Sequence, residues 1–212
     1  GGKGTRLAEE TKKIPKPLVK IGRLPILKHI INHYRKYQFD DFILAAGYKH
    51  RQMSDYFKSD KKVKVVNTGL NTLTGGRIKR LETIFHKDNL FMVTYGDGLS
   101  DINIKQLLRF HIDHKRIATL TAVRPPARFG RVLVKGSKVI SFKEKEQANE
   151  GWINGGFFVF NKEIFSFLKN DKTVLEEYPL EKLTAQNQLR AFKHEKFWQC
   201  MDTIRDRDYL RE

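Results

Sequence analysis

The first six residues of the chain combine glycine with cationic and hydroxyl side chains. Glycine lets backbone N–H groups turn toward an anion without a side chain in the way, which is typical of a phosphate-binding nest. The loop is not a Walker A motif, because Lys3 is followed by Gly4 where that motif needs Ser or Thr. A flexible tag-like terminus is the alternative interpretation. The predicted phosphate-binding residues are Gly1, Gly2, Gly4, Thr5 and Arg6.

A lysine between two prolines follows ten residues later. Each proline fixes its own φ and restricts the residue before it, so Pro15 and Pro17 present Lys16 on a stiffened backbone. A charge positioned in this way stabilises a phosphate more than a mobile charge does. A surface turn is the commoner role of Pro-Lys-Pro.

An aspartate flanked by glycines follows an apolar run. Asp97 lies between Gly96 and Gly98, directly after the predicted strand Leu90–Thr94. Mg²⁺ prefers hard oxygen ligands, commonly one or two carboxylates completed by waters and phosphate oxygens. Asp97 is therefore a candidate metal ligand, although an aspartate in such a turn can also simply accept local backbone hydrogen bonds.

The hydrophobic pattern predicts alternating strands and helices. Apolar runs bounded by turn signals predict strands at Phe42–Ala46, Val63–Asn67, Leu90–Thr94, Ala118–Val123, Val132–Val134, Val139–Phe142 and Phe157–Phe160. Helical periodicity covers Ile26–Tyr37, Gln52–Phe57, Gly76–Phe85, Asn103–Lys115, Lys162–Leu168 and Leu180–Gln188. This alternation predicts an α/β fold with a mostly parallel mixed sheet covered on both faces.

Ligands of such sheets bind at the carboxyl ends of the strands. Three segments next to predicted strands are therefore expected to carry chemistry: the N-terminal loop, Tyr95–Gly98, and Trp152–Gly156 before the Phe157 strand. A strand is also expected before Gly1, because a phosphate loop of this kind normally hangs from a strand end.

Length and composition limit the remaining possibilities. A chain of 212 residues with 40% hydrophobic content predicts one soluble domain, residues 1–212, and no apolar run is long enough to span a membrane. Cys200 is the only cysteine, which excludes an intrachain disulfide and favours the cytoplasm. The net charge of +17 suits a polyanionic partner. A basic surface around a phosphorylated substrate is favoured over a nucleic-acid-binding surface, because no nucleic-acid recognition motif accompanies the charge.

Taken together, these motifs resemble the sugar-1-phosphate nucleotidylyltransferase family. The N-terminal match joins G-G-x-G-T-R-L, P-K-P-L-V and I-G-x-x-P-I-L, and further matches cover most of the chain. They lie at Thr68–Arg77, Tyr95–Asp101, Arg124–Gly130, Gly151–Val159 and Phe197–Thr203. The T-x-T-G-G-R segment resembles the base-recognition loop of the cytidylyltransferases. The resemblance implies a Rossmann-like three-layer α/β/α fold, CTP and glucose 1-phosphate as substrates, Mg²⁺ as cofactor, and a homo-oligomer.

The resemblance also implies a role for each matching residue. Asp97 and Asp202 would hold Mg²⁺, while Arg6, Lys16 and Lys145 would act on the reacting phosphates. Asp202 has an alternative role as the N-cap of the last helix. Thr74 has an alternative role as the N-cap of the helix that is expected to begin at Gly76. The implied nucleotide contacts beyond the first loop are Thr72, Gly76, Arg77 and Gly96, and the implied sugar-side contacts are Gly130, Glu144, Lys145 and Asn154.

The chain departs from this family pattern at two places. Glu146 stands where relatives usually carry proline after Glu-Lys, which predicts a less rigid loop. Only Lys58–Val66 separates the Tyr56 region from Asn67, where relatives carry a longer stretch. UTP, dTTP or another sugar phosphate remain alternative substrates, a nucleotide-binding regulatory module without turnover is a second class, and a nucleic-acid-binding protein is a third.

Overall fold

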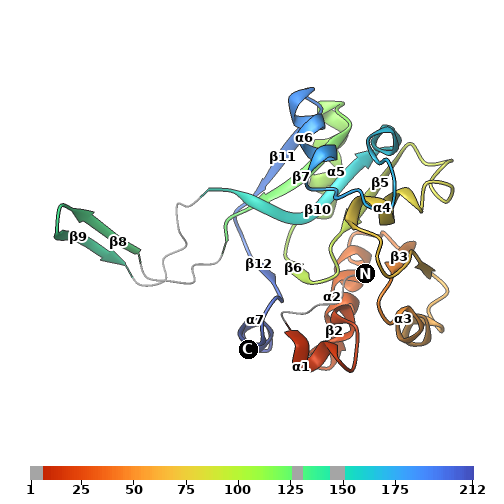
Figure 1. Ribbon diagram of the computed structural model, residues 1–212, viewed down its shortest axis with the longest axis horizontal. Coiled ribbons are helices and arrows are strands. Elements are labelled where there is room, and N and C mark those ends of the chain that lie inside the picture. The colour runs from red at the N-terminus through yellow and green to blue at the C-terminus, as the bar shows by residue number, and fades with distance from the viewer. Residues whose placement is uncertain (1–6, 126–130, 144–150) are drawn as a thin grey trace.

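The computed structural model describes residues 7–125, 131–143 and 151–212 (Figure 1). Its helices are α1 (Ala8–Thr11), the 3-10 helix η2 (Lys16–Leu18), α2 (Ile26–Arg35), α3 (His50–Phe57), α4 (Thr74–Lys79), α5 (Ile104–His114), the 3-10 helix η3 (Lys162–Phe167), α6 (Tyr178–Ala185) and α7 (Ile204–Tyr209). Its strands are β1 (Lys20–Ile21), β2 (Leu24–Pro25), β3 (Phe42–Ala46), β4 (Val63–Asn67), β5 (Leu90–Thr94), β6 (Gly98–Ser100), β7 (Ala118–Val123), β8 (Arg131–Lys135), β9 (Lys138–Lys143), β10 (Ile153–Asn161), β11 (Leu189–His194) and β12 (Trp198–Cys200).

The largest sheet has four strands in the order β11-β7-β10-β5. β11 pairs with β7 in parallel, whereas β10 is antiparallel to both β7 and β5. Three of the four strands therefore run in one direction, and the sheet is mixed, as predicted. It is not mostly parallel in its pairings, because β10 lies between two of these strands and only the β11–β7 pairing is parallel. A register shift in β10 lies between Asn154 and Phe158.

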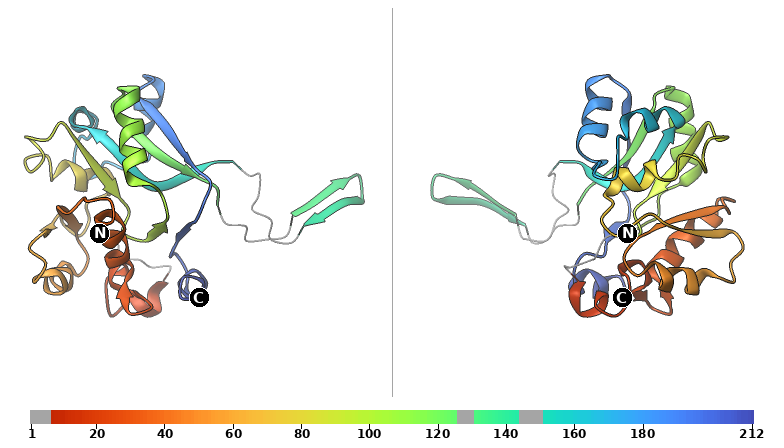
Figure 2. Two further views of the ribbon diagram at one scale, coloured as in Figure 1. Left: turned by 180° about the vertical axis from the view of Figure 1, so that it is seen from behind. Right: turned by 45° about the vertical axis from the view of Figure 1, so that its right-hand side comes forward.

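Strand β10 shows why this sheet is covered on both faces. Its side chains alternate, so Phe157 and Val159 pack into one buried cluster with α2 and α5, whereas Phe158 and Phe160 pack into another with η3 and α6. Helices therefore lie on both sides of the sheet, as the two further views show (Figure 2). The predicted three-layer α/β/α arrangement is confirmed.

Two further pairs of strands lie outside the four-stranded sheet: β3 with β4, and β6 with β12. β3 and β4 pair in parallel, and the apolar face of α2, which includes Ile30, Ile31 and Tyr34, is buried beside them. β6 and β12 pair antiparallel, with Cys200 opposite Gly98. This last pairing brings the segment after β5 next to the segment that precedes α7.

The hairpin of β8 and β9 lies apart from the rest of the described chain in each view (Figures 1 and 2). Its strands pair antiparallel through a turn at Gly136, whose φ is +60°. Its exposed apolar side chains are Val132, Leu133, Val134, Val139, Ile140 and Phe142. Neither strand has a third strand beside it among the described residues.

Most predicted elements are present, with four corrections. β10 begins at Ile153 and not at Phe157, so the expected Trp152–Gly156 loop is largely strand. The helix expected over Gly76–Phe85 begins at Thr74 and ends at Lys79. The helix expected over Lys162–Leu168 is the 3-10 helix η3. The sequence patterns did not predict the short elements β1, β2, β6, β12, α1 and η2, nor the edge strand β11.

Candidate functional site

Lys16 opens the 3-10 helix η2, where the flanking prolines hold the backbone. Pro15 is extended at φ −67° and ψ 144°, and its carbonyl accepts the Leu18 N–H at 2.8 Å. Pro17 packs on the turn that carries Asp97, because a Cβ added to Gly96 would lie 3.3 Å from Pro17 Cγ. The backbone of Lys16 is thus fixed beside that turn, as the Pro-Lys-Pro pattern predicted.

Asp97 and Asp202 reach the same place through the pairing of β6 with β12. Asp97 precedes β6, Asp202 follows β12, and the Asp97 carbonyl accepts the Met201 N–H at 2.8 Å. The Asp202 N–H donates to the Asp206 carboxylate at 3.0 Å, which anchors its backbone at the start of α7. The side-chain cap of α7 is Thr203 in a capping box with Asp206, so the alternative role of Asp202 as that cap is wrong.

The Lys16 ammonium lies between the two carboxylates. Its Nζ is 2.7 Å from Asp97 Oδ2 and 2.7 Å from Asp202 Oδ1. Burial disfavours the charged form and is the largest single effect on this lysine, but the two carboxylates together outweigh it and raise the pKa of Lys16. The ammonium is therefore charged at neutral pH, and the two carboxylate oxygens that it joins are no more than twice 2.7 Å apart.

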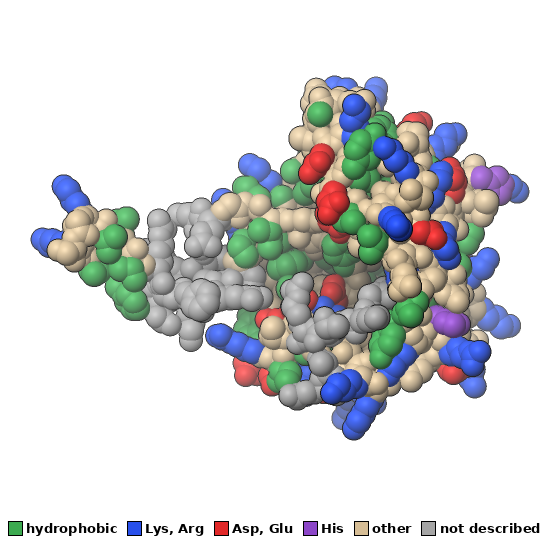
Figure 3. Space-filling view, in the orientation of Figure 1, with side chains coloured by type: hydrophobic (Ala, Val, Ile, Leu, Met, Phe, Trp, Pro, Cys, Tyr) green, Lys and Arg blue, Asp and Glu red, His purple; other side chains and the backbone are tan. Residues whose placement is uncertain are grey.

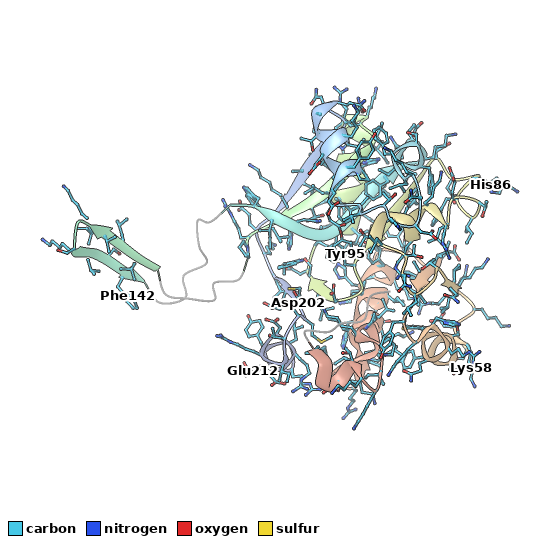
Figure 4. All side chains as sticks on the ribbon, in the orientation of Figure 1. Lys58, His86, Tyr95, Phe142, Asp202 and Glu212 are labelled. Atoms are coloured by element: carbon cyan, nitrogen blue, oxygen red, sulfur yellow. The ribbon has the colours of Figure 1, made fainter. Side chains whose placement is uncertain are left out.

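This triad borders a cavity of about 880 Å³. Its lining includes residues of β3 and β5 and of the loop that precedes α4. Tyr95 and Asp202 lie where the four-stranded sheet meets the lower group of helices (Figure 4). A cavity of this size is large enough for a nucleotide-sized ligand. The predicted site residues that line it are Lys16, Thr72, Arg77, Gly96, Asp97 and Asp202.

Arg77 is buried, and its guanidinium holds the segment after β4. It donates to Thr68 Oγ1 at 2.7 Å and to the Gly69 carbonyl at 2.8 Å. Thr72 is also buried and lines the cavity. The structure thus gives Arg77 a loop-shaping role that the sequence pattern did not predict, beside the nucleotide contact that the resemblance implies.

Gly76 has a packing reason to be glycine. A Cβ at this position would lie 2.5 Å from the Asp171 carbonyl oxygen, so α4 approaches the neighbouring loop too closely for a side chain. Gly76 is not among the described residues that line the cavity. The cap expected at Thr74 is also wrong: Leu73 is the N-cap, and the Thr74 hydroxyl donates to Glu176 at 2.6 Å.

Sequence reasoning missed Glu176, which borders the cavity. Its carboxylate accepts hydrogen bonds from the Tyr95 and Thr74 hydroxyls. Burial, followed by the nearby Glu176 carboxylate, raises the pKa of Tyr95, so its phenol stays protonated. Local sequence carries no signal for this contact, because Tyr95 and Glu176 are 81 positions apart.

Asn154 lies on β10, behind the Tyr95 side chain. Its Oδ1 accepts the Gly156 N–H at 2.9 Å, and it also hydrogen-bonds with Tyr95. Asn154 is not among the described residues that line the cavity. Its sugar contact therefore stays a prediction.

Cysteine and histidine chemistry has no support at this site. Burial raises the pKa of Cys200 to about 11, so the thiol is protonated at neutral pH and serves as packing. Within residues 7–125, 131–143 and 151–212, no group of three or more His, Cys, Asp or Glu side chains is arranged to hold a metal. Outside this site, His111 and His114 share Thr119 as a hydrogen-bond partner.

The donor chemistry of Asp97 and Asp202 fits Mg²⁺. Two carboxylates from different elements converge on one cation, the Lys16 ammonium, so the pocket is already built to surround positive charge. Ligand oxygens on one Mg²⁺ are about 2.1 Å from the metal and so at most about 4.2 Å apart. The two oxygens are at most twice 2.7 Å apart, so an approach of about 1.2 Å at most would bring them to that spacing.

Eight of the predicted site residues lie outside the described ranges. They are Gly1, Gly2, Gly4, Thr5, Arg6, Gly130, Glu144 and Lys145. Their roles therefore stay predictions.

Comparison with known proteins agrees with this geometry. The chain is 42% identical to a glucose-1-phosphate cytidylyltransferase of Salmonella typhimurium over 99% of its own length and 91% of that protein. The aligned 235 positions exceed the 212 residues of the chain, so the relative carries residues without a counterpart here. The chain is also 33% identical to a D-glycero-alpha-D-manno-heptose 1-phosphate guanylyltransferase of Aneurinibacillus thermoaerophilus, over 91% of the chain and 86% of that protein.

A solved structure has the same fold. HddC from Yersinia pseudotuberculosis, complexed with GMP-PN, superposes with a TM-score of 0.77 at 25% identity and covers 100% of this chain and 95% of its own. The model of the family described as "Nucleotidyl transferase" matches residues 1–203. The chain therefore belongs to the nucleotidyl transferase family.

Proposed function

We propose that this chain converts CTP and glucose 1-phosphate to CDP-glucose and pyrophosphate. The observation that carries the proposal is the Lys16 ammonium held between Asp97 and Asp202 at the edge of a nucleotide-sized cavity. The choice of CTP and glucose 1-phosphate is supported by the 42% identity to a glucose-1-phosphate cytidylyltransferase over nearly the whole chain.

The reaction joins two anions and needs no covalent enzyme intermediate. A phosphate oxygen of glucose 1-phosphate attacks the α-phosphorus of CTP in line, the new P–O bond forms, and the bond to the β-phosphate breaks, which releases pyrophosphate. The main task of the protein is to position the reactants and to neutralise their charge.

In this scheme Lys16 is the phosphate-neutralising cation. The pKa of its ammonium is raised, and the backbone of the residue is fixed. Lys16 can therefore offer a constant positive charge to phosphate oxygens at neutral pH. Asp97 and Asp202 would hold Mg²⁺. The ion would supply charge neutralisation to the triphosphate and help to orient it.

The nucleotide is assigned to the cavity and to the first loop. Thr72, Arg77 and Gly96 line the cavity, and Gly76 allows α4 to pack closely on the backbone of Asp171. The remaining roles follow the family resemblance: phosphate binding by Gly1, Gly2, Gly4, Thr5 and Arg6, and sugar-phosphate contacts by Gly130, Glu144, Lys145 and Asn154.

Pyrophosphate release tests the proposal. CTP, UTP, dTTP and GTP are each combined with several sugar 1-phosphates and Mg²⁺, and turnover is expected to be greatest for CTP with glucose 1-phosphate. Asp97→Asn and Asp202→Asn should each lower kcat by about 100-fold or more, because each removes a charged metal ligand. Asp101→Asn is the matched control, since Asp101 pairs with His194 at the other end of β6.

Other outcomes would assign the chain differently. Turnover with another triphosphate or sugar would change the substrate and keep the reaction. Tight CTP binding with no product would favour the regulatory module without turnover. Oligonucleotide binding with steep salt dependence that CTP does not displace would favour a nucleic-acid partner. Lys and Arg side chains are scattered over the visible face instead of gathering in one stripe (Figure 3).

We also propose that the chain forms a homo-oligomer, with β8 and β9 in the contact. A two-stranded hairpin alone is marginally stable in water, and Phe142 is 62% exposed here. Apolar side chains are visible on this isolated hairpin (Figure 3). Sedimentation should show dissociation when Ile140 and Phe142 are both replaced by Ser.

The cellular setting is the last part of this proposal. Cys200 is the only cysteine, so a reducing cytoplasm suits the chain. Among the described residues, no helix is both long and apolar enough to cross a membrane.

A further inference from the structure

The ammonium of Lys16 bridges one carboxylate oxygen of Asp97 and one of Asp202, the two residues proposed to hold Mg²⁺. Both contacts are 2.7 Å, the length of a strong charge-assisted hydrogen bond. The lysine side chain is only 13% exposed, whereas the carboxylates are 31% and 25% exposed. Lys16 is thus more buried than the two carboxylates, which remain partly open to solvent.

The fold explains how this arrangement is held. Pro17 rests on the turn at Gly96, and the β6–β12 pairing fixes the backbones of both aspartates. The three charged groups therefore come from three separate segments that pack together. The long Lys16 side chain can change rotamer, and such a change would release the oxygens without moving the backbone.

We infer that Lys16 is a built-in counter-ion that holds the Asp97–Asp202 pair in the nucleotide-free chain and competes with free divalent cations for it. This inference rests on the proposed function, in which the same carboxylates hold Mg²⁺. A metal ion sharing both oxygens must displace the ammonium, because two cations cannot approach the same oxygen face without strong repulsion.

A triphosphate changes this balance. Its oxygens offer the displaced ammonium new anionic partners, so the metal and the nucleotide each make binding of the other more favourable. A divalent cation alone therefore binds weakly to Asp97 and Asp202, whereas the cation together with CTP binds well. Lys16 would thereby restrict metal loading to the nucleotide-bound chain.

Mn²⁺ binding, followed by electron paramagnetic resonance, tests this inference without relying on turnover. Wild-type protein and Lys16→Met are titrated with Mn²⁺ in the absence of nucleotide. Lys16→Met should bind Mn²⁺ at least tenfold more tightly, because the competing ammonium is gone and the side chain keeps a similar length. With CTP present the difference should shrink, since only wild-type protein gains the lysine–phosphate contact.

Two controls keep the result interpretable. Asp97→Asn should abolish the tight Mn²⁺ binding of the Lys16→Met background, which places the ion at this pair. Thermal unfolding with and without Mn²⁺ gives a second readout, and the ion should raise the Tm of folded Lys16→Met more than that of wild type. Melting without Mn²⁺ shows whether the variant is folded.

Equal or weaker Mn²⁺ binding by folded Lys16→Met would overturn the inference, as would tight binding that Asp97→Asn leaves intact. Pyrophosphate release by the same wild-type preparation distinguishes a failure of the counter-ion inference from a failure of the proposed function. Normal release combined with unchanged Mn²⁺ binding would refute the counter-ion role and leave the proposed function standing.

Discussion

The guanidinium of Arg77 donates a 2.7 Å hydrogen bond to the hydroxyl of Thr68, linking α4 to the residue that follows β4. Thr68 in turn donates to the Ala46 carbonyl at the end of β3 at 2.9 Å. A Cβ at Gly47 would lie 2.6 Å from Arg77 Nη1, so the chain passes directly over the guanidinium. One buried cation thus organises the segments that surround the cavity.

Replacing this cation should therefore cost stability. Arg77→Met leaves the Gly69 carbonyl and Thr68 without their buried donor, and the free energy of unfolding should fall by about 1–3 kcal/mol. Urea unfolding measures the change. Arg80→Met is the matched control on the same helix turn, because Arg80 and Asp171 are 44% and 49% exposed and such pairs contribute little. Equal losses in both variants would contradict the organising role of Arg77.

Stability should also depend on pH through a pair of histidines. Burial lowers the pKa of His111, whose buried ring contacts Thr119 and Asn161, and partial burial lowers the pKa of His114, whose ring contacts Thr119. A lowered folded-state pKa means that the unfolded chain binds protons first. The contribution to stability is therefore complete above about pH 6.5, the ordinary histidine value, and is lost as the pH falls below it toward the folded-state pKa values.

The measurement is the free energy of unfolding between pH 8 and pH 5. Wild type should lose stability over this range, and His111→Gln should show a shallower dependence. His86→Gln serves as the control, because His86 is exposed and its ring hydrogen-bonds with the nearby Thr83 carbonyl. A slope that is the same in all three proteins would show that the buried pair is not its source.

Gly156 and Tyr95 provide a third test. Gly156 has a φ of +75°, and a Cβ there would lie 2.8 Å from Tyr95 Cδ2. Gly156→Ala should lower stability by roughly 1–3 kcal/mol through the strained backbone, and it should displace Tyr95 from Glu176. Gly151→Ala is the matched control, because a Cβ at Gly151 meets nothing within 4 Å. Chemical denaturation and CTP binding of both variants measure the two effects.

The sequence predicted best the strands that are runs of apolar and β-branched residues, since these residue types favour strands. β5 and β7 are such runs, and they appear with the expected bounds. β11 has no such run: it lies at the sheet edge, where Arg190 and Lys193 can reach solvent, and parallel backbone pairing with β7 defines it. Strands of three residues such as β6 and β12 carry too few side chains for any period to be recognised.

The same limit applies to the site. Asp97 was recognisable from its glycine turn after an apolar strand, but Asp202 was assigned through family resemblance alone. Its proximity to Asp97 depends on the β6–β12 pairing, which links residues about a hundred positions apart. The ion pair with Lys16 and the contact of Glu176 with Tyr95 also depend on tertiary packing, so no local pattern could have predicted them.

A space between two strands motivates the last prediction. β5 is an end strand of the four-stranded sheet, β3 pairs only with β4 among the described strands, and residues 43–46 and 91–94 line the same cavity. The carboxyl ends of both strands, at Gly47 and Gly96, also line it. We propose that an extended apolar segment running parallel to β3 and β5 fills the part of this space between the two strands, and that the nucleotide occupies the part bordered by Lys16, Thr72 and Asp97.

Adding such a segment should stabilise the fold. Five β-branched apolar residues placed before Gly1 should raise the Tm by several degrees, since new backbone hydrogen bonds and apolar burial would join β3 to β5. Hydrogen exchange should slow at the amides of residues 43–46 and 91–94, which line the cavity. A Gly-Ser extension of equal length should change neither quantity. If the apolar extension also leaves exchange at both strands unchanged, then no strand occupies this space and the cavity is available to ligands along its whole length.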